Sequence, residues 1–168
     1  KSLAYARHYP AINWTMSYSE YVDDLAPWYE ENIGPQFMKL RGAIAGLLQE
    51  ESKLMEIVKL IGADVLPDDQ KLIIEVARVI RVGFLQQNAY HAEDTYVPLT
   101  KQLKMMEVIL HFYEKAKQAV ISGVPVGKIL ATGEMDRLVK MKYDVPNSQI
   151  ELLDGYDAEI DRRIAEIQ

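Results

Sequence analysis

A helical spacing of apolar residues, sustained over most of the chain, is the feature that most constrains the fold. From about residue 17 onward, apolar side chains recur every three to four positions, which places them on one face of an α-helix. The strict alternation of apolar and polar residues that marks a half-buried strand is not found after the first few residues. We therefore predict an all-α fold, a helical bundle preceded by an irregular or extended N-terminal arm over residues 1–16.

Prolines and glycines divide this pattern into separate helices. A long helix is expected from Pro35 to Gly62, either continuous or as two helices joined near Ser52, with the glycine as its C-terminal cap. The next helix is expected to begin at Pro67 or Asp68, because proline suits the first turn and a carboxylate there favours the positive end of the helix dipole. Its predicted buried stripe consists of Leu72, Ile73, Val76, Ile80 and Phe84.

A second long helix has the clearest pattern in the chain. Residues 88–96 lack helical spacing, and Pro98 then restarts a helix that ends before Gly123. Its predicted apolar stripe consists of Leu103, Met106, Leu110, Tyr113 and Val120.

Three shorter helices are expected after Gly123. One lies within residues 123–134, and the next covers residues 135–143. The last is predicted to run from Ser148, a residue type that caps helix N-termini well, to Gln168.

Composition and charge limit the possible functions. The chain has 168 residues, of which 49% are hydrophobic, enough for one domain with a sizeable core. Its net charge of -6 gives no positive field for a phosphate backbone, so nucleic acid is not an expected partner. Charges interrupt every apolar stretch, so no direct membrane insertion is expected. The lack of cysteine suits a reducing compartment, and we expect a cytoplasmic protein.

The beginning of the chain indicates a larger parent protein. The sequence starts at Lys1 without an initiator methionine, in a stretch that has no helical spacing and no capping residue. We therefore expect that it was cut from a longer chain.

The segment GVPVGK, residues 123–128, partly resembles a phosphate-binding loop. Such a loop needs two glycines at a longer spacing, then a lysine, and then a serine or threonine that binds magnesium. Here the spacing is one residue short, Ile129 replaces the hydroxyl residue, and no predicted strand precedes the segment. We interpret it as the end of one helix and the start of another.

The residues alone predict no catalytic residue and no metal site. His111 and Glu114 have the spacing of two ligands on one helical face, which is half a metal site at best. The neighbouring carboxylates Asp23 and Asp24, and likewise Asp68 and Asp69, point in different directions on a helix, so we interpret them as caps or solvated residues. No nucleophile motif with serine or cysteine is present.

Two segments resemble the catalytic subunits of V/A-type rotary ATPases and ATP synthases. HYPAINW, residues 8–14, is similar to the FPAINW stretch that ends their nucleotide-binding domain, where F-type relatives have YPAVDPL. GADVLPDDQKLIIEVARVIRVGFLQQNAY, residues 62–90, is similar to a helix-loop-helix that ends in FLQQNAF. SYSEYVDDLAPWY and KQLKMMEVILHFYEKA follow these motifs in the family's order. The resemblance implies that residues 1–16 end a nucleotide-binding domain and that residues 17–168 form the C-terminal helical domain.

The resemblance implies an adenine pocket at the seam between the two domains. Tyr9 matches the aromatic residue that lies against the adenine of bound nucleotide in such subunits. Tyr90 matches the second aromatic residue of the pocket, and Gln87, Asn88 and Ala89 would form the wall beside it. The family usually has phenylalanine at the position of Tyr90, and tyrosine keeps the flat ring while adding a hydroxyl.

The resemblance also implies a contact with the central rotor stalk. F-type relatives carry the acidic DELSEED loop at the corresponding place. The matching residues are Asp64, Val65, Leu66, Pro67, Asp68, Asp69 and Gln70. Closure of a nucleotide domain on ATP would carry this loop outward through a rigid bundle. An acidic helix start is an alternative reason for the two neighbouring carboxylates, and both can hold together.

For the parent protein, the resemblance implies an enzyme that couples ATP hydrolysis or synthesis to proton or sodium translocation. Its cofactors would be ATP or ADP with Mg. Its partners would be the central stalk subunits and the neighbouring non-catalytic B subunits of a hexameric ring, on the cytoplasmic face of the membrane. This chain lacks the family's phosphate-binding loop and catalytic glutamate, so we expect no activity and no cofactor by itself. The alternative is a stand-alone soluble helical protein-interaction module without nucleotide binding.

Overall fold

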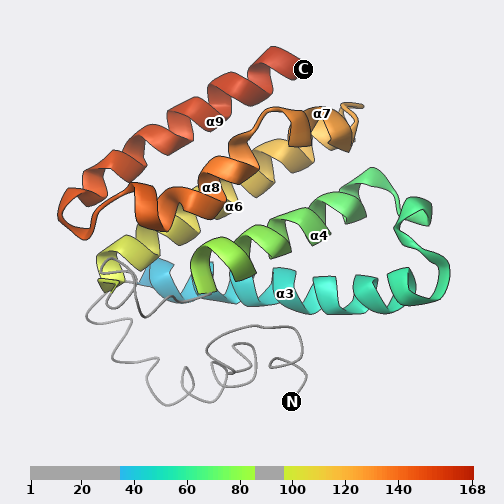
Figure 1. The fold of residues 1–168 in the computed structure, drawn as a ribbon, viewed down its shortest axis with the longest axis horizontal. Coiled ribbons are helices and arrows are strands. Elements are labelled where there is room, and N and C mark those ends of the chain that lie inside the picture. Colours follow the sequence, from blue (N-terminus) through green and yellow to red (C-terminus); the bar gives the residue numbers. More distant parts are fainter. Residues whose placement is uncertain (1–34, 86–96) are drawn as a thin grey trace.

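The computed structural model describes residues 35–85 and 97–168 of the chain (Figure 1). Within these ranges it contains six α-helices and three shorter helical segments, and no strand. The α-helices are α3 (Pro35–Ile61), α4 (Asp68–Val79), α6 (Leu99–Ile121), α7 (Val126–Ala131), α8 (Glu134–Asp144) and α9 (Asp154–Ile167). The prediction of an all-α fold is confirmed for this part of the chain. The predicted N-terminal arm and the domain boundary after residue 16 lie outside the described residues.

The three shorter segments differ in their helical type. Two of them, η1 (Ala63–Val65) and η3 (Asn147–Leu153), are 3₁₀-helices, whereas η2 (Ile80–Leu85) is a π-helix. Because η2 follows α4 without a break, the chain from Asp68 to Leu85 is one continuous helical segment. No helix in the two described ranges is long and apolar enough to cross a bilayer.

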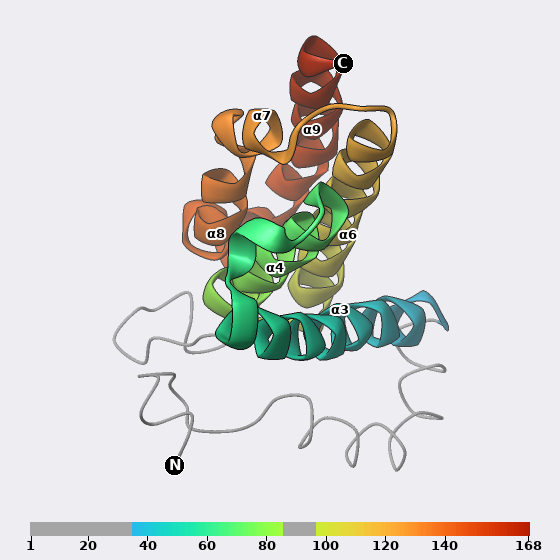
Figure 2. The ribbon, with the colours of Figure 1, turned by 90° about the vertical axis from the view of Figure 1, so that its right-hand side faces the viewer.

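Successive long helices run in alternating directions through the bundle (Figure 1). Viewed from one end, α3 crosses beneath the others at a steep angle (Figure 2). Helix α6 is the central element, because it contacts α3, α4, α8 and α9. The α3–α4 loop and the α6–α7 turn therefore lie at the same end of the bundle, which is the right-hand end in Figure 1.

Most of the helix boundaries predicted from the sequence are confirmed. Helix α3 is continuous and ends at Ile61. It is followed by Gly62, which has a φ of 89° that favours glycine. Helix α4 begins at Asp68 directly after Pro67, and α6 begins directly after Pro98. The two shorter helices expected next are α7 and α8.

Helix α6 ends in a Schellman motif at Gly123. The N–H of Gly123 donates to the carbonyl of Val120 at 3.0 Å, and the N–H of Val124 donates to the carbonyl of Ala119 at 3.0 Å. Gly123 has a φ of 109°, in the left-handed region that glycine adopts at little cost. The GVPVGK segment therefore ends one helix, and the next begins at Val126, in agreement with our interpretation of the sequence.

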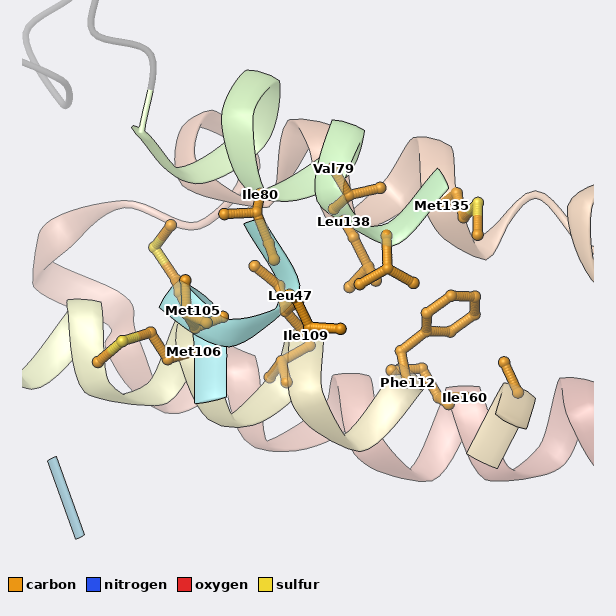
Figure 3. Packing of buried hydrophobic residues seen from close by; sticks show 14 of the residues in the cluster. Leu47, Val79, Ile80, Met105, Met106, Ile109, Phe112, Met135, Leu138 and Ile160 are labelled. Carbon is orange, nitrogen blue, oxygen red and sulfur yellow. The ribbon is translucent and has the colours of Figure 1, made fainter. Parts of the chain in front are cut away.

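Buried apolar side chains from all the long helices meet in one core (Figure 3). The predicted stripe of α4 belongs to it. Leu72, Val76 and Ile80 are buried, whereas Ile73 and Phe84 are partly buried and pack against the cluster. This part of the pattern was correctly predicted because α4 covers the bundle with a single face.

The predicted apolar stripe of α6 is wrong in its phase. Of its members only Met106 is buried, and the others are half-buried. The buried residues of the helix are Lys101, Met105, Met106, Val108, Ile109, Phe112, Ala116 and Ala119. Helix α6 is covered on several sides, and its buried face includes a lysine and two alanines. A search for large apolar residues does not mark these positions.

Lys101 is a buried cation that closes the C-terminal end of α8. Its Nζ donates to the carbonyls of Lys142 at 2.9 Å and Val145 at 2.7 Å, and to Oδ1 of Asn147 at 2.8 Å. The last carbonyls of a helix have no partner within their own helix, so a lysine from another helix satisfies them. This single side chain therefore fixes the end of α8 on the central helix.

The last helix begins later than predicted, and the prediction that Ser148 caps it is wrong. Gln149, within η3, has the non-helical angles φ -130° and ψ 45°, and α9 begins only at Asp154. No side-chain cap is formed at the start of η3 or of α9. The cause is tertiary. Pro146 precedes η3, and Lys101 binds the side chain of its first residue, so this turn is set before Ser148 can act as a cap.

Candidate functional site

The loop between α3 and α4 lies at the exposed end of the helical hairpin (Figure 2). It contains the residues that the sequence assigns to a stalk contact. Asp64, Val65, Pro67 and Asp69 are exposed, Asp68 and Gln70 are half-buried, and Leu66 is buried with 6% of its surface exposed. The structure thus brings these residues together at one end, with Leu66 turned away from solvent as the anchor of the loop.

An apolar patch that sequence reasoning missed adjoins this loop. Leu60 is 84% exposed and Ile61 is 62% exposed at the end of α3, and Val65 is 57% exposed in η1. Ile57, one turn earlier on the same face of α3, is also exposed. These residues continue the helical spacing of the core, so the sequence pattern does not distinguish them from buried ones. Only the end of the surrounding bundle leaves them uncovered.

A hydrogen bond between distant segments fixes the base of the loop. Oδ2 of Asp68 accepts the backbone N–H of Val126, the first residue of α7, at 3.0 Å and over 58 positions of sequence. The interpretation of Asp68 and Asp69 as a cap and a solvated residue is confirmed, but Asp68 caps α7 and not its own helix. Asp69 is exposed beside it. The other carboxylate pair, Asp23 and Asp24, lies outside the described residues.

Negative charge surrounds this end of the bundle. Burial raises the pKa of the Tyr113 hydroxyl on α6, and the carboxylates of Glu114, Asp69 and Glu50 raise it further. Because Asp69 acts on α6 as well as on α4, the loop and the central helix share one acidic environment. An exposed apolar patch beside carboxylates suits a partner that presents apolar and basic side chains.

The opposite end of the α4–η2 segment leads to the second set of predicted residues. Tyr9, Gln87, Asn88, Ala89 and Tyr90 lie outside the described residues. The segment that carries the chain toward four of them ends at Leu85. Its start is the loop at Asp68, roughly 25 Å away along a helical path. One helical segment therefore joins the predicted stalk contact to the approach to the predicted adenine residues.

Two contacts hold η2 against its neighbours. Nη2 of Arg81 donates to Oε2 of Glu51 on α3 at 2.7 Å. Burial raises the pKa of Glu51, and Arg81 opposes this shift by favouring the charged form. Gly83 lies so close to α8 that a Cβ there would be 2.8 Å from Cα of Val139. The π-helix is thus fixed on both sides.

The histidine that the sequence marks as half of a metal site has a different neighbour. Nε2 of His111 lies 2.7 Å from Oδ1 of Asp161 on α9. Across the two described ranges, no three His, Cys, Asp or Glu residues gather closely enough to hold a metal ion. His111 therefore belongs to the polar seam between α6 and α9.

These features define a class of protein. The described residues form a helical bundle domain whose most distinctive surface is an exposed, acidic and apolar loop at one end. Residues 26–130 match the family described as the C-terminal domain of V and A type ATP synthase, and the chain belongs to this family.

Two similar relatives bear names from the same enzymes. The chain is 57% identical over 150 residues to V-type ATP synthase alpha chain 2 of Clostridium tetani, covering 89% of this chain and 25% of the relative. It is 51% identical over 147 residues to a subunit of the A-type ATP synthase of Methanopyrus kandleri, covering 88% of this chain and 25% of the relative. The chain thus spans about a quarter of the length of the curated relatives it matches.

Proposed function

We propose that this chain is the C-terminal helical domain of the catalytic subunit of a V/A-type rotary ATPase or ATP synthase. In this proposal it passes the nucleotide-driven movement of the subunit to the central rotor stalk. The observation that carries the proposal is the continuous segment from Asp68 to Leu85. It begins at the exposed loop and ends immediately before Gln87–Tyr90. A rigid helix between two sites can carry a displacement from one to the other.

The loop contact with the stalk is supported by its exposure. Leu60, Ile61 and Val65 present an apolar patch at the end of the longest described helix, beside the carboxylates of Asp64 and Asp69. Exposed apolar patches of this kind commonly mark protein–protein contacts. The partner in this proposal is the rotor stalk, and the neighbouring B subunits of the ring would pack elsewhere on the parent protein.

The nucleotide role belongs to the parent protein. Tyr9 and Tyr90 would contact adenine, with Gln87, Asn88 and Ala89 beside them, while ATP or ADP with Mg is held mainly by groups outside this chain. In this proposal the parent enzyme moves protons or sodium and lies on the cytoplasmic face of the membrane. The chain by itself is expected to have no ATPase activity.

A cross-link tests the stalk contact. The chain contains no cysteine, so Val65→Cys in an otherwise cysteine-free parent protein introduces a single thiol at the tip of the loop. We expect a disulfide to form with cysteines placed along the stalk in the assembled ATPase. Leu152→Cys is the matched control, because Leu152 is also an apolar residue, 49% exposed, but lies in η3 at the other end of the bundle. Equal cross-linking of both variants, or of neither, would contradict the proposed contact.

Substitution of Tyr90 tests the adenine contact. Tyr90→Ala in the full-length protein removes the stacking ring, which should weaken nucleotide binding by about 1–2 kcal/mol, or roughly five- to thirtyfold. Since adenine is far from the bond that breaks, steady-state kinetics should show the loss mainly in KM for ATP and little in kcat. Tyr90→Phe keeps the ring and should be nearly silent. An unchanged KM for Tyr90→Ala would mean that Tyr90 does not contact adenine.

A further inference from the structure

Asp68 joins two parts of the exposed end that are distant in sequence. Its Oδ2 accepts the N–H of Val126 at 3.0 Å. Val126 is the first residue of α7, and the first N–H groups of a helix have no carbonyl partner within that helix. A carboxylate at this position also interacts favourably with the helix dipole. Both effects favour a bond that ties the start of α4 to the start of α7.

The two ends of this bond differ in how firmly they are held. On one side, the Schellman motif at Gly123 fixes the turn that joins α7 to the central helix α6. On the other side, the α3–α4 loop leaves α3 through Gly62, which has a φ of 89° and no atom within 4 Å of the position of a Cβ. An uncrowded glycine at this joint can absorb bending. The bond at Asp68 therefore connects a bendable loop to a well-fixed turn.

We infer that Asp68 is a positioning residue that clamps the loop to the α6–α7 turn, so that the loop pushes on the stalk as part of the whole bundle. Without the clamp, force on Val65 would bend the loop about Gly62 and would not reach α6. This inference rests on the proposed function, because it assumes that the loop is the element that meets the stalk. It adds the residue that makes the loop stiff.

The test uses the assembled ATPase that contains the full-length protein, with Asp68→Ala and the neighbouring control Asp69→Ala. The readout is the coupling ratio, which is ATP-driven ion transport divided by ATP hydrolysis. We expect Asp68→Ala to lower this ratio while hydrolysis continues, and Asp69→Ala to leave it unchanged, since Asp69 is exposed. Backbone hydrogen exchange at Val126 should become about tenfold faster in Asp68→Ala, because the N–H loses a charged acceptor. A merely structural defect would reduce assembly and hydrolysis together.

Two further variants separate the hydrogen bond from the charge. Asp68→Asn keeps an oxygen that can accept the N–H of Val126, so it should retain most of the coupling. Val126→Pro removes the donor while leaving Asp68 intact, and proline is well tolerated at the first position of a helix. It should lower the coupling ratio as Asp68→Ala does, and the double variant Asp68→Ala/Val126→Pro should be no worse than either single variant.

The possible failures are distinguishable. If Asp68→Ala speeds exchange at Val126 and the coupling ratio stays the same, the clamp has no role in transmission and the inference is wrong, even where the Val65 cross-link still forms. Equal loss in Asp68→Asn and Asp68→Ala would also overturn it, because the acceptor is retained in the asparagine variant. Absence of the Val65 cross-link would instead contradict the proposed stalk contact itself.

Discussion

Replacing Phe112 with alanine is expected to lower the free energy of unfolding of the 168-residue chain by about 3–5 kcal/mol. Phe112 is fully buried on the central helix. Its ring lies in the core with Leu138 from α8 and Ile160 from α9 (Figure 3). Removal of the ring loses its transfer free energy and leaves a cavity that three packed helices cannot easily close. Urea denaturation followed by circular dichroism would measure the change.

The neighbouring residue provides a matched control. Tyr113 has a ring of similar size on the same helix but is only half-buried. Tyr113→Ala should therefore cost clearly less than Phe112→Ala, because less surface returns to water and a smaller cavity remains. Similar losses in both variants would show that the structure has the wrong face of α6 in the core.

Lys101→Met should also destabilise the chain strongly, by about 2–4 kcal/mol. Methionine nearly fills the space of the lysine stem but donates no hydrogen bond. The carbonyls of Lys142 and Val145 and the side chain of Asn147 would then lose the donor that the ammonium supplies. Relief from burying a charge offsets part of this cost, but not the loss of donors to two main-chain carbonyls. The same denaturation experiment measures the change.

A second lysine on the same helix tests the specificity of this effect. Nζ of Lys104 lies 2.8 Å from Oδ1 of Asp154, but both side chains are largely in solvent. An exposed ion pair of this kind contributes at most about 1 kcal/mol, so Lys104→Met should change stability little. If the two substitutions had equal effects, burial of Lys101 would not be the cause.

The helix boundaries were predictable because local residues set them. Pro67 and Pro98 precede helices, and Gly62 and Gly123 follow them, through backbone preferences that hold in any surroundings. The start of α9 was not predictable in this way. Tertiary contacts at Lys101 decide the local turn, so the good capping residue Ser148 is not used.

The candidate site was predictable in position but not in structure. The resemblance to rotary ATPases marked the loop from Asp64 to Gln70, and the structure places it at an exposed end. Exposure of Leu60 could not be foreseen, because the same spacing would suit a buried residue. The bond from Asp68 to Val126 links positions 58 apart in sequence, and no short-range pattern records such a pairing.

The π-helix η2 has a consequence for insertions and deletions. A π-helical turn accommodates one more residue than an α-helical turn. Loss of one residue from Ile80–Leu85 could therefore be absorbed by a return to α-helical geometry, with the rest of α4 left in place. Everything after the lost residue would then rotate by about 100° around the helix axis, the angle of one α-helical step. A change of a single codon here would redirect the chain as it leaves Leu85 while leaving the loop at Asp68 untouched.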